Sequence, residues 1–242
     1  MAIVFWAALS LPGAAFQPCE PEAVISDFDR SARPVDGFDR EQKQLGDIVL
    51  ATDPLSGSNV TARMVAGPKF AGKVGKADLI LGFDPLGAGH RVQMRGRFFF
   101  PAGSRLDSVI LMDLECATCG LDTNPGIRLY LRRGYLRVDR SKIGYAETFN
   151  QNVPLKLRTD TWHDIIWQVD LGKGEAGGST VLLDGAEVMN AVGTTIPTKE
   201  AARKVTNKPI RELVDRFQVG LTANSNSVAQ TLYLDTVTFC TQ

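Results

Sequence analysis

The chain has 242 residues, and its 27 Lys and Arg side chains balance 27 Asp and Glu side chains, so the formal net charge is zero. This balance excludes a protein that holds nucleic acid through bulk positive charge, and 44% hydrophobic with 22% charged residues excludes a disordered chain. The chain has two His and four Cys residues, and no Cys/His spacing is typical of a zinc site.

The N-terminus begins with an apolar run. Residues 2–16 are apolar and then small, as in a secretory signal peptide, although no Lys or Arg precedes the run. The run is too short to span a bilayer. We expect residues 1–18 to be a signal peptide, with a buried strand or helix as the alternative. The mature protein would then be secreted or periplasmic, without a membrane partner.

Residues 19–45 are polar and lack a clear period, which predicts an irregular leader. From residue 46 onward, short apolar or alternating runs separated by turn signals predict strands. The predicted strands are residues 47–52, 60–65, 76–83, 90–100, 107–115, 127–132, 135–140, 162–171, 179–184, 187–190, 216–223 and 230–239. Asp184-Gly185, between two apolar runs, is the strongest hairpin signal.

Residues 198–215 interrupt this rhythm and predict one or two short helical turns divided by Pro209. About a dozen strands with one helical insertion predict an all-β protein. We expect residues 46–242 to form one antiparallel two-sheet β-sandwich with a short helical insertion near 198–215. We also expect a monomer.

The four cysteines agree with export. Cys116 and Cys119 stand in Cys-Ala-Thr-Cys, and Cys19 and Cys240 lie near the chain ends. Four cysteines allow three pairings. A Cys116–Cys119 bond would close a short loop, and a Cys19–Cys240 bond would contribute roughly 4 kcal/mol or more in the chain-entropy description. A redox-active Cys-x-x-Cys is the alternative for the first pair, but Gly120 and a turn-rich segment follow it.

Alternation along three predicted strands gives polar faces rich in Arg and Tyr. These faces carry Arg91, Gln93, Arg95, Arg97 and Phe99; Arg128, Tyr130 and Arg132; and Tyr135, Arg137 and Asp139. The guanidinium group of Arg offers a planar fork for carboxylate or sulfate, and Tyr offers a flat surface for a sugar ring. The pattern favours an acidic chain ligand other than nucleic acid, with a plain solvated sheet as the alternative.

A family resemblance rests on the residues from Thr161-Trp162-His163 to Asp170, and on Ser179–Val188 with its Asp-Gly turn. They resemble the Trp-His strand and hairpin of concanavalin A-like jelly-roll polysaccharide lyases, in the branch of heparin lyase I-like and glucuronan lyase-like proteins. Residues 94–101 and 232–239 resemble two further strands of that branch. The resemblance spans residues 46–240. It implies a curved antiparallel sandwich with a substrate groove on its concave sheet.

Many members of that family cleave uronic-acid polysaccharides by β-elimination. The reaction needs a group that neutralises the uronate carboxylate, a base for the C5 proton and an acid for the leaving oxygen. For a lyase we expect Arg91, or Arg95 with Gln93, to neutralise the carboxylate. Tyr130, Tyr135 or Tyr145 would be the acid and base. The predicted substrate-binding residues are Gln93, Arg95, Arg128, Arg132, Arg137 and Tyr145.

One strand departs from the family. Where such lyases often carry Gln-x-His, this chain has Asp113-Leu114-Glu115. Two functions therefore stay open: an exported lyase acting on an acidic polysaccharide, and a non-catalytic carbohydrate-binding or surface-adhesion module. Hydrolysis by a carboxylate pair is a third, but the Glu-x-Asp-x-x-Glu pattern of jelly-roll hydrolases is absent. We expect no cofactor beyond a structural Ca²⁺, to which Asp27, Asp29 and Asp235 could contribute.

Overall fold

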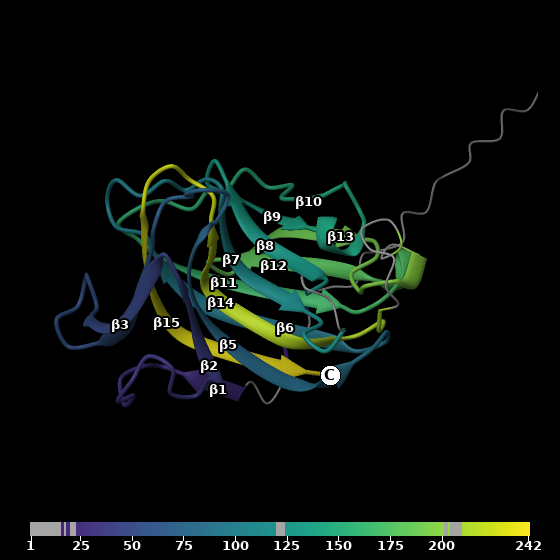
Figure 1. Cartoon of the computed structure of the whole chain (residues 1–242), viewed down its shortest axis with the longest axis horizontal. Coiled ribbons are helices and arrows are strands. Elements are labelled where there is room, and N and C mark those ends of the chain that lie inside the picture. The colour runs from purple at the N-terminus through teal and green to yellow at the C-terminus, as the bar shows by residue number, and fades with distance from the viewer. Residues whose placement is uncertain (1–15, 17, 20–22, 120–123, 201–202, 204–209) are drawn as a thin grey trace, which may run out of the picture.

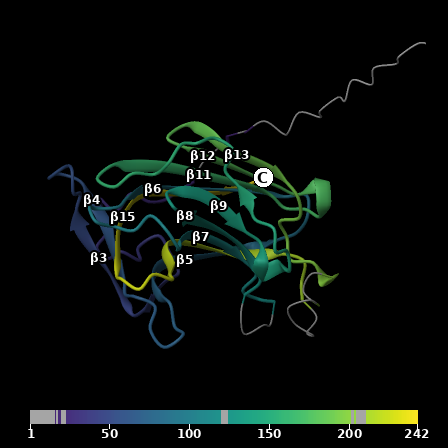
Figure 2. The same ribbon diagram turned by 90° about the horizontal axis from the view of Figure 1, so that it is seen from above.

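The computed structural model describes residues 16, 18–19, 23–119, 124–200, 203 and 210–242. Two antiparallel sheets pack face to face as a sandwich (Figures 1 and 2). Sheet A has the order β13 (Ala186–Val192), β12 (Gly178–Leu183), β11 (Trp162–Asp170), β6 (Arg91–Phe99), β15 (Gln230–Thr241), β4 (Val60–Ala66) and β3 (Gly46–Thr52), and β1 (Ala23–Ser26) also pairs with β15. Sheet B has the order β10 (Phe149–Asn150), β9 (Tyr135–Asp139), β8 (Gly126–Arg132), β7 (Val109–Glu115), β14 (Val214–Asn224), β5 (Gly75–Leu86) and β2 (Arg40–Gln44).

The core lies between the sheets and is built by alternation along the strands. Trp167 and Phe98 of sheet A and Phe217 and Leu114 of sheet B are completely buried. Each such side chain contributes about 1.5–3 kcal/mol through removal of apolar surface from water. The same alternation turns the polar residues of each strand outward, so each sheet has a polar outer face.

All twelve predicted strands are present, and the all-β sandwich is confirmed. The predicted hairpin at Asp184-Gly185 joins β12 to β13, and both residues have positive φ, 52° and 81°. Arg133-Gly134 makes the same kind of turn between β8 and β9, with φ values of 54° and 80°. Two positive φ angles match the turn type that suits the twist of paired strands.

The segment 19–45, expected to be irregular, contains two strands. β1 pairs with the last strand, β15, and β2 pairs with β5 at the edge of sheet B. β2 reads Arg-Glu-Gln-Lys-Gln, without an apolar alternation, because charged residues suit an edge strand that is covered on one side only. The two-residue strand β10 and the short 3₁₀ helices η1 (Ser141–Ile143) and η2 (Gly174–Ala176) were not predicted either.

The signal peptide expected at 1–18 lies almost wholly outside the described residues, which include only 16 and 18 of it. The helical turns expected near 198–215 lie partly outside, since 201–202 and 204–209 are not described; the described residues 199–200 and 203 are helical, and β14 begins at Val214. Within the described residues, the chain has no helix with the length and apolar character needed to cross a membrane.

Both anticipated disulfides are present. Cys19 is bonded to Cys240 of β15, with Cα atoms 6.3 Å apart, and Cys116 is bonded to Cys119 directly after β7, with Cα atoms 5.5 Å apart. Asp215 of β14 supports the short Cys116–Cys119 turn, because its carboxylate accepts hydrogen bonds from the backbone N–H groups of Ala117 and Thr118, at 2.5 and 3.1 Å. One bond therefore ties the N-terminal segment to sheet A, and the other fixes a turn at the end of sheet B.

Candidate functional site

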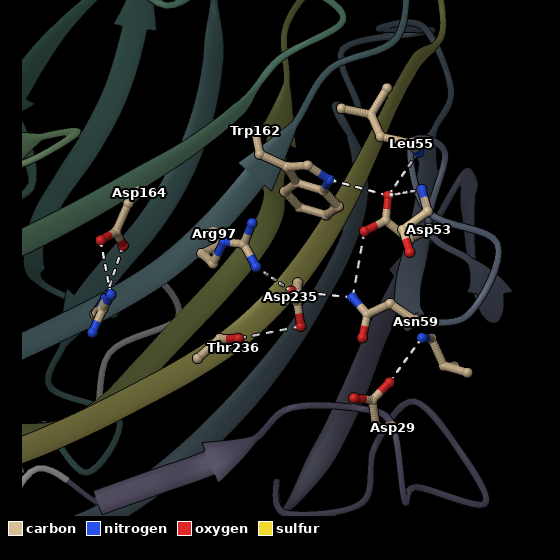
Figure 3. A network of polar contacts seen from close by, with 12 residues as sticks. Asp29, Asp53, Leu55, Asn59, Arg97, Trp162, Asp164, Asp235 and Thr236 are labelled. Atoms are coloured by element: carbon tan, nitrogen blue, oxygen red, sulfur yellow. Dashed lines mark hydrogen bonds and ion pairs between the residues drawn. The ribbon is translucent and has the colours of Figure 1, made fainter.

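The arginines of β6 lie on the outer face of sheet A and are paired with aspartates. The pairs are Arg91 Nε–Asp170 Oδ1 at 2.5 Å, Arg95 Nε–Asp164 Oδ1 at 2.8 Å and Arg97 Nη1–Asp235 Oδ2 at 2.9 Å; Figure 3 shows the last of them. The strand register explains two of these pairs, since Arg91 stands directly opposite Asp170 of β11 and Arg97 directly opposite Asp235 of β15, whereas Arg95 reaches Asp164 diagonally. Gln93 of the same face is 4% exposed.

The arginines and tyrosines of β8 and β9 lie on the outer face of sheet B. Arg128 stands opposite Asp139, Tyr130 opposite Arg137, and Arg132 opposite Tyr135. The predicted substrate-binding residues therefore do not share one face, because Arg91, Gln93 and Arg95 of sheet A lie on the opposite side of the sandwich from the arginines of β8 and β9. Alternation tells which side chains of a strand point away from the core, but not which sheet the strand belongs to, and both sheets have polar outer faces.

Tyr145 belongs to neither outer face, because it lies in the loop between η1 and β10. It follows η1 and packs partly against the core, and the guanidinium group of Arg140 lies 5.0 Å from the centre of its ring. Such a cation over an aromatic ring is a stabilising contact. The catalytic and binding roles suggested for Tyr130, Tyr135 and Tyr145 stay predictions.

A pocket of about 400 Å³ lies on the outer face of sheet B, and we call it the sheet B pocket. Its lining includes the charged and amide side chains of Asp113, Glu115, Arg128, Lys142, Arg216 and Gln218. Strand register brings them together: Asp113 of β7 stands opposite Arg128 of β8 and Gln218 of β14, and Glu115 stands opposite Arg216. Adjacent strands lie about 4.8 Å apart, so side chains in register on one face are neighbours.

Glu115 is a buried carboxylate that is saturated with donors. It is 3% exposed and accepts hydrogen bonds from Gln218 Nε2 at 2.8 Å and Asn124 Nδ2 at 3.2 Å. Lys142 of η1 adds a short charge-assisted contact from its ammonium group. Three donors and an opposite charge compensate a carboxylate for its loss of water.

Asp113 is also buried, at 4% exposure, but its surroundings differ. Among the described residues no group hydrogen-bonds to Asp113 Oδ1, and the nearest cation, Lys142 Nζ, is 4.0 Å away. Burial and the neighbouring Glu115 charge raise the pKa of Asp113 to about 6. Burial likewise raises the pKa of Asp78, on the same face of β5, well above its ordinary value. The face therefore holds two buried carboxyl groups with raised pKa values.

Arg128 is the one predicted binding residue that lines the sheet B pocket. Its guanidinium group makes a short ion pair with Asp139 and a 3.2 Å hydrogen bond to Ser141 Oγ. Two further pockets extend along the same sheet. One, of about 650 Å³, is lined by Arg40, Thr118 and Arg216 among others, and shares Arg216 with the sheet B pocket. The other, of about 310 Å³, is lined by residues that include Tyr135, Arg137 and Asn150.

Sequence reasoning missed several pocket residues. Arg216 and Gln218 alternate on β14 in the same way as the arginines of β8, so the alternation argument would have found them. Lys142 carries no such signal, because it lies in a three-residue 3₁₀ helix and reaches Glu115 across 27 positions.

Both histidines lie away from the sheet B pocket. His163 of β11 is 2% exposed, accepts a hydrogen bond at Nε2 from the Arg158 N–H at 2.9 Å, and makes a 2.8 Å contact from Nδ1 to Asp184. The accepting Nε2 assigns the proton to Nδ1, which therefore donates to Asp184. His163 thus holds the β12–β13 turn against β11. His90 is exposed in the loop before β6.

Two of the three aspartates considered for Ca²⁺, Asp29 and Asp235, lie at a polar network on sheet A (Figure 3). Asn59 Nδ2 lies 3.4 Å from both Asp53 Oδ2 and Asp235 Oδ2, and the N–H of Val60 donates to Asp29 Oδ1 at 2.9 Å. Protein donors thus serve these carboxylates. In the described part of the chain, no group of three or more His, Cys, Asp or Glu side chains is arranged to hold a metal ion. The structural Ca²⁺ stays a prediction.

No protein-family model and no curated protein matches the sequence. Solved structures do resemble the fold. An endo-β-1,4-glucuronan lyase from the fungus Trichoderma reesei has a TM-score of 0.62 at 15% identity, covering 85% of this chain and 91% of its own. The cellulose-induced protein Cip1 has 0.55 at 14% identity, covering 82% and 87%. The alginate lyase vAL-1 from Chlorella virus has 0.54 at 14% identity, covering 90% and 99%.

Identities this low establish the fold and nothing finer. The predicted resemblance to glucuronan lyase-like proteins is confirmed at that level. Among the similar structures reported above none is a heparin lyase, so that part of the resemblance stays a prediction. The chain has the jelly-roll sandwich fold that glucuronan and alginate lyases use.

Proposed function

We propose that the chain is an exported polysaccharide lyase that cleaves an acidic, uronate-containing polysaccharide by β-elimination on the outer face of sheet B. The observation that carries this proposal is the charge of the sheet B pocket. Four cationic side chains and two carboxyl side chains line it, in a chain whose formal net charge is zero. The cations are Lys76, Arg128, Lys142 and Arg216.

A local excess of positive charge selects an anionic ligand. A concave site lined by one sign of charge concentrates the opposite sign. The excess survives the presence of Asp113 and Glu115, because four cationic side chains in the lining outnumber these two carboxyl groups. The carboxylates that replace Gln-x-His therefore do not prevent the binding of a uronate.

The pocket also offers the first requirement of β-elimination. Neutralising a uronate carboxylate makes the C5 proton more acidic, and charged or amide donors do this in a site that excludes water. Arg128, Lys142 and Gln218 supply such donors around Asp113. Arg216 lines two pockets and Tyr135 with Arg137 lines another, so several sugar units would lie along the sheet.

Two further observations support export. The chain holds two disulfides and its described residues have no free cysteine. Disulfides persist in oxidising compartments and are rare in the cytosol.

A non-catalytic carbohydrate-binding module is the second candidate. It is favoured by the position of both histidines away from the pocket and by the absence of Tyr130 from its lining. Either candidate would use the same cationic face. They differ only in whether a covalent bond is broken.

Incubation with glucuronan, alginate, heparin and hyaluronan separates the candidates. A lyase produces unsaturated sugar ends, which absorb ultraviolet light, from at least one polymer. Retention on an immobilised polymer without new absorbance would support the binding module instead. Neither retention nor cleavage with any of the four polymers would contradict both.

A further inference from the structure

We propose that Asp113 is the catalytic base of this elimination, and that the same carboxyl group returns the proton to the leaving oxygen. The inference rests on the proposed lyase function and assigns a role that a His or Tyr would otherwise fill. It starts from a contrast between two carboxyl groups that share one face of β7.

Glu115 and Asp113 are nearly equally buried but differ in what surrounds them. Glu115 has three donors and is held in place by them. Asp113 Oδ1 has no hydrogen-bond partner among the described residues, and the Thr222 hydroxyl, which also lines the pocket, acts to lower the pKa of Asp113. A buried polar atom without a partner costs free energy, and such atoms in native proteins need an explanation. An incoming substrate would supply the missing partner.

Charged groups face Asp113 from every neighbouring element. Glu115 lies on its own strand, Arg128 on β8, Lys142 on η1, Arg216 on β14, and Lys76 and Asp78 on β5. Burial and Glu115 raise the pKa of Asp113, and Lys142 and Arg128 lower it, with a balance at about 6. A base is most effective when its pKa lies near the working pH. Asp113 is therefore ionised at neutral pH and still basic enough to accept a proton.

The reaction is balanced without any further reactant. The Asp113 carboxylate takes the C5 proton of a uronate whose own carboxylate is held by Arg128 and Lys142. The electron pair of the C5–H bond forms the C4–C5 double bond, and the C4–O4 bond breaks. The leaving oxygen takes the proton from the Asp113 carboxylic acid, which regenerates the carboxylate.

A single carboxyl group that handles both protons restricts the substrate. The C5 proton and O4 must lie on the same face of the sugar ring, because one side chain has to reach both. Glucuronate and mannuronate have this configuration, whereas guluronate and galacturonate have the two on opposite faces. We therefore infer that the substrate is a polymer of glucuronate or mannuronate.

The direct test is Asp113→Asn, which keeps the size of the side chain and removes its basicity. We expect kcat on glucuronan or polymannuronate to fall at least about 100-fold, since general acid–base catalysis contributes factors of this order. Retention on the immobilised polymer is expected to persist. Asp47→Asn, an exposed aspartate of β3 in sheet A, is the matched control with unchanged kcat.

A pH profile tests the same assignment without removing Asp113. We expect kcat/KM of the wild type to fall as the pH drops through about 6, because the base becomes protonated. Glu115→Gln removes a negative neighbour and should move this limb to lower pH, whereas Lys142→Gln should move it to higher pH. If Asp113 had only a structural role, neither Glu115→Gln nor Lys142→Gln would shift the acidic limb of the kcat/KM profile.

The outcomes separate the two proposals. If the wild type cleaves no uronate polymer, the lyase function fails. If the wild type cleaves but Asp113→Asn cleaves equally well, or if Tyr130→Phe abolishes cleavage while Asp113→Asn spares it, only the assignment of Asp113 fails. Asp113-dependent cleavage of polyguluronate or polygalacturonate would overturn the single-carboxyl mechanism.

Discussion

The outer faces of the two sheets contain similar residues and differ in how these residues are paired. On sheet A, each of three arginines of β6 faces an aspartate from β11 or β15. On sheet B, four cations line a pocket with two carboxyl groups; Arg128 is paired with Asp139 and Lys142 with Glu115, and among the described residues Lys76 and Arg216 have no ion pair. The number of arginines on a face therefore does not identify a binding surface. The charge left after pairing does.

Two buried carboxyl groups, Asp53 beside sheet A and Asp113 on sheet B, differ in their surroundings. Asp53 lies in the loop after β3, where burial acts to raise the pKa of its carboxyl group. Its carboxylate accepts hydrogen bonds from the Leu55 N–H at 2.7 Å and Trp162 Nε1 at 3.1 Å, and the pKa is lowered from its ordinary value. Asp113 on sheet B receives too few donors, and its pKa is raised. The Asp53 carboxylate is thus satisfied by protein donors, whereas Asp113 Oδ1 keeps an acceptor position without a partner among the described residues of the sheet B pocket.

The largest expected effect concerns the disulfide on sheet A. In the chain-entropy description, the bond that closes a 221-residue separation stabilises by about 5 kcal/mol, and the bond that closes a separation of 3 by about 2 kcal/mol. We expect the Cys19→Ser/Cys240→Ser variant to lose more free energy of unfolding than the Cys116→Ser/Cys119→Ser variant. Denaturant unfolding measures both. A larger loss of free energy of unfolding in the Cys116→Ser/Cys119→Ser variant would contradict the prediction that the Cys19–Cys240 bond stabilises the protein more.

The second prediction concerns Asp113 and stability. Because its folded pKa of about 6 lies above the usual 3.8, the folded state binds the proton more tightly than the unfolded state. The free energy of unfolding therefore falls as the pH rises from about 4 to about 6, by about 3 kcal/mol in total. Asp113→Asn should remove this loss and stabilise the protein at pH 7 by up to that amount.

The matched variant is Asp53→Asn. Its carboxyl has a lowered pKa, so its stabilising contribution is present at neutral pH and disappears as the pH falls through that pKa. Asp53→Asn should destabilise at pH 7, whereas Asp113→Asn should stabilise. Thermal unfolding at pH 7 and at a pH below the Asp53 pKa compares the two variants, and effects of the same sign at pH 7 would remove the distinction between the two carboxyl groups.

The third prediction compares binding. Arg128→Ala and Arg216→Ala, on sheet B, should each weaken retention of an acidic polymer by about tenfold or more, which corresponds to about 1.4 kcal/mol. Arg91→Ala, on sheet A, should leave it unchanged, since this face lies across the sandwich from the pocket. Affinity electrophoresis in gels that contain the polymer measures all three. Equal losses from both faces would show that the ligand does not use sheet B alone.

The sequence predicted the strands well because each strand buries one face. Leu129 and Leu131 of β8 alternate with Arg128 and Tyr130, and this period alone fixes which side chains point inward. The edge strand β2 lacks that period, because polar residues suit its position, and so it escaped prediction.

Sheet membership could not be read in the same way. β6 pairs with β11 and β15, whose sequences lie far along the chain, and nothing local in residues 91–99 specifies those partners. This is why Arg91 and Arg95 were grouped with Arg128. The pocket depends on such distant pairings throughout, since Asp113 meets Gln218 across more than 100 positions.

The smallest expected effect concerns the ion pairs of sheet A themselves. Arg95 and Asp164 make two hydrogen bonds, at 2.8 and 2.9 Å, and both side chains are about 30% exposed. Partly exposed pairs contribute about 0.2–1 kcal/mol because solvent screens them. A double-mutant cycle with Arg95→Ala and Asp164→Ala should give a coupling free energy in this range.

Polymer binding should stay at the wild-type level in all members of that cycle, because the pair stabilises β6 against β11 and does not contact the sheet B pocket. A coupling above the range would give this pair a larger structural role than its exposure predicts. A loss of binding in either single variant would be more serious, since it would mean that the acidic ligand also uses the outer face of sheet A, and the contrast between the two faces would then fail.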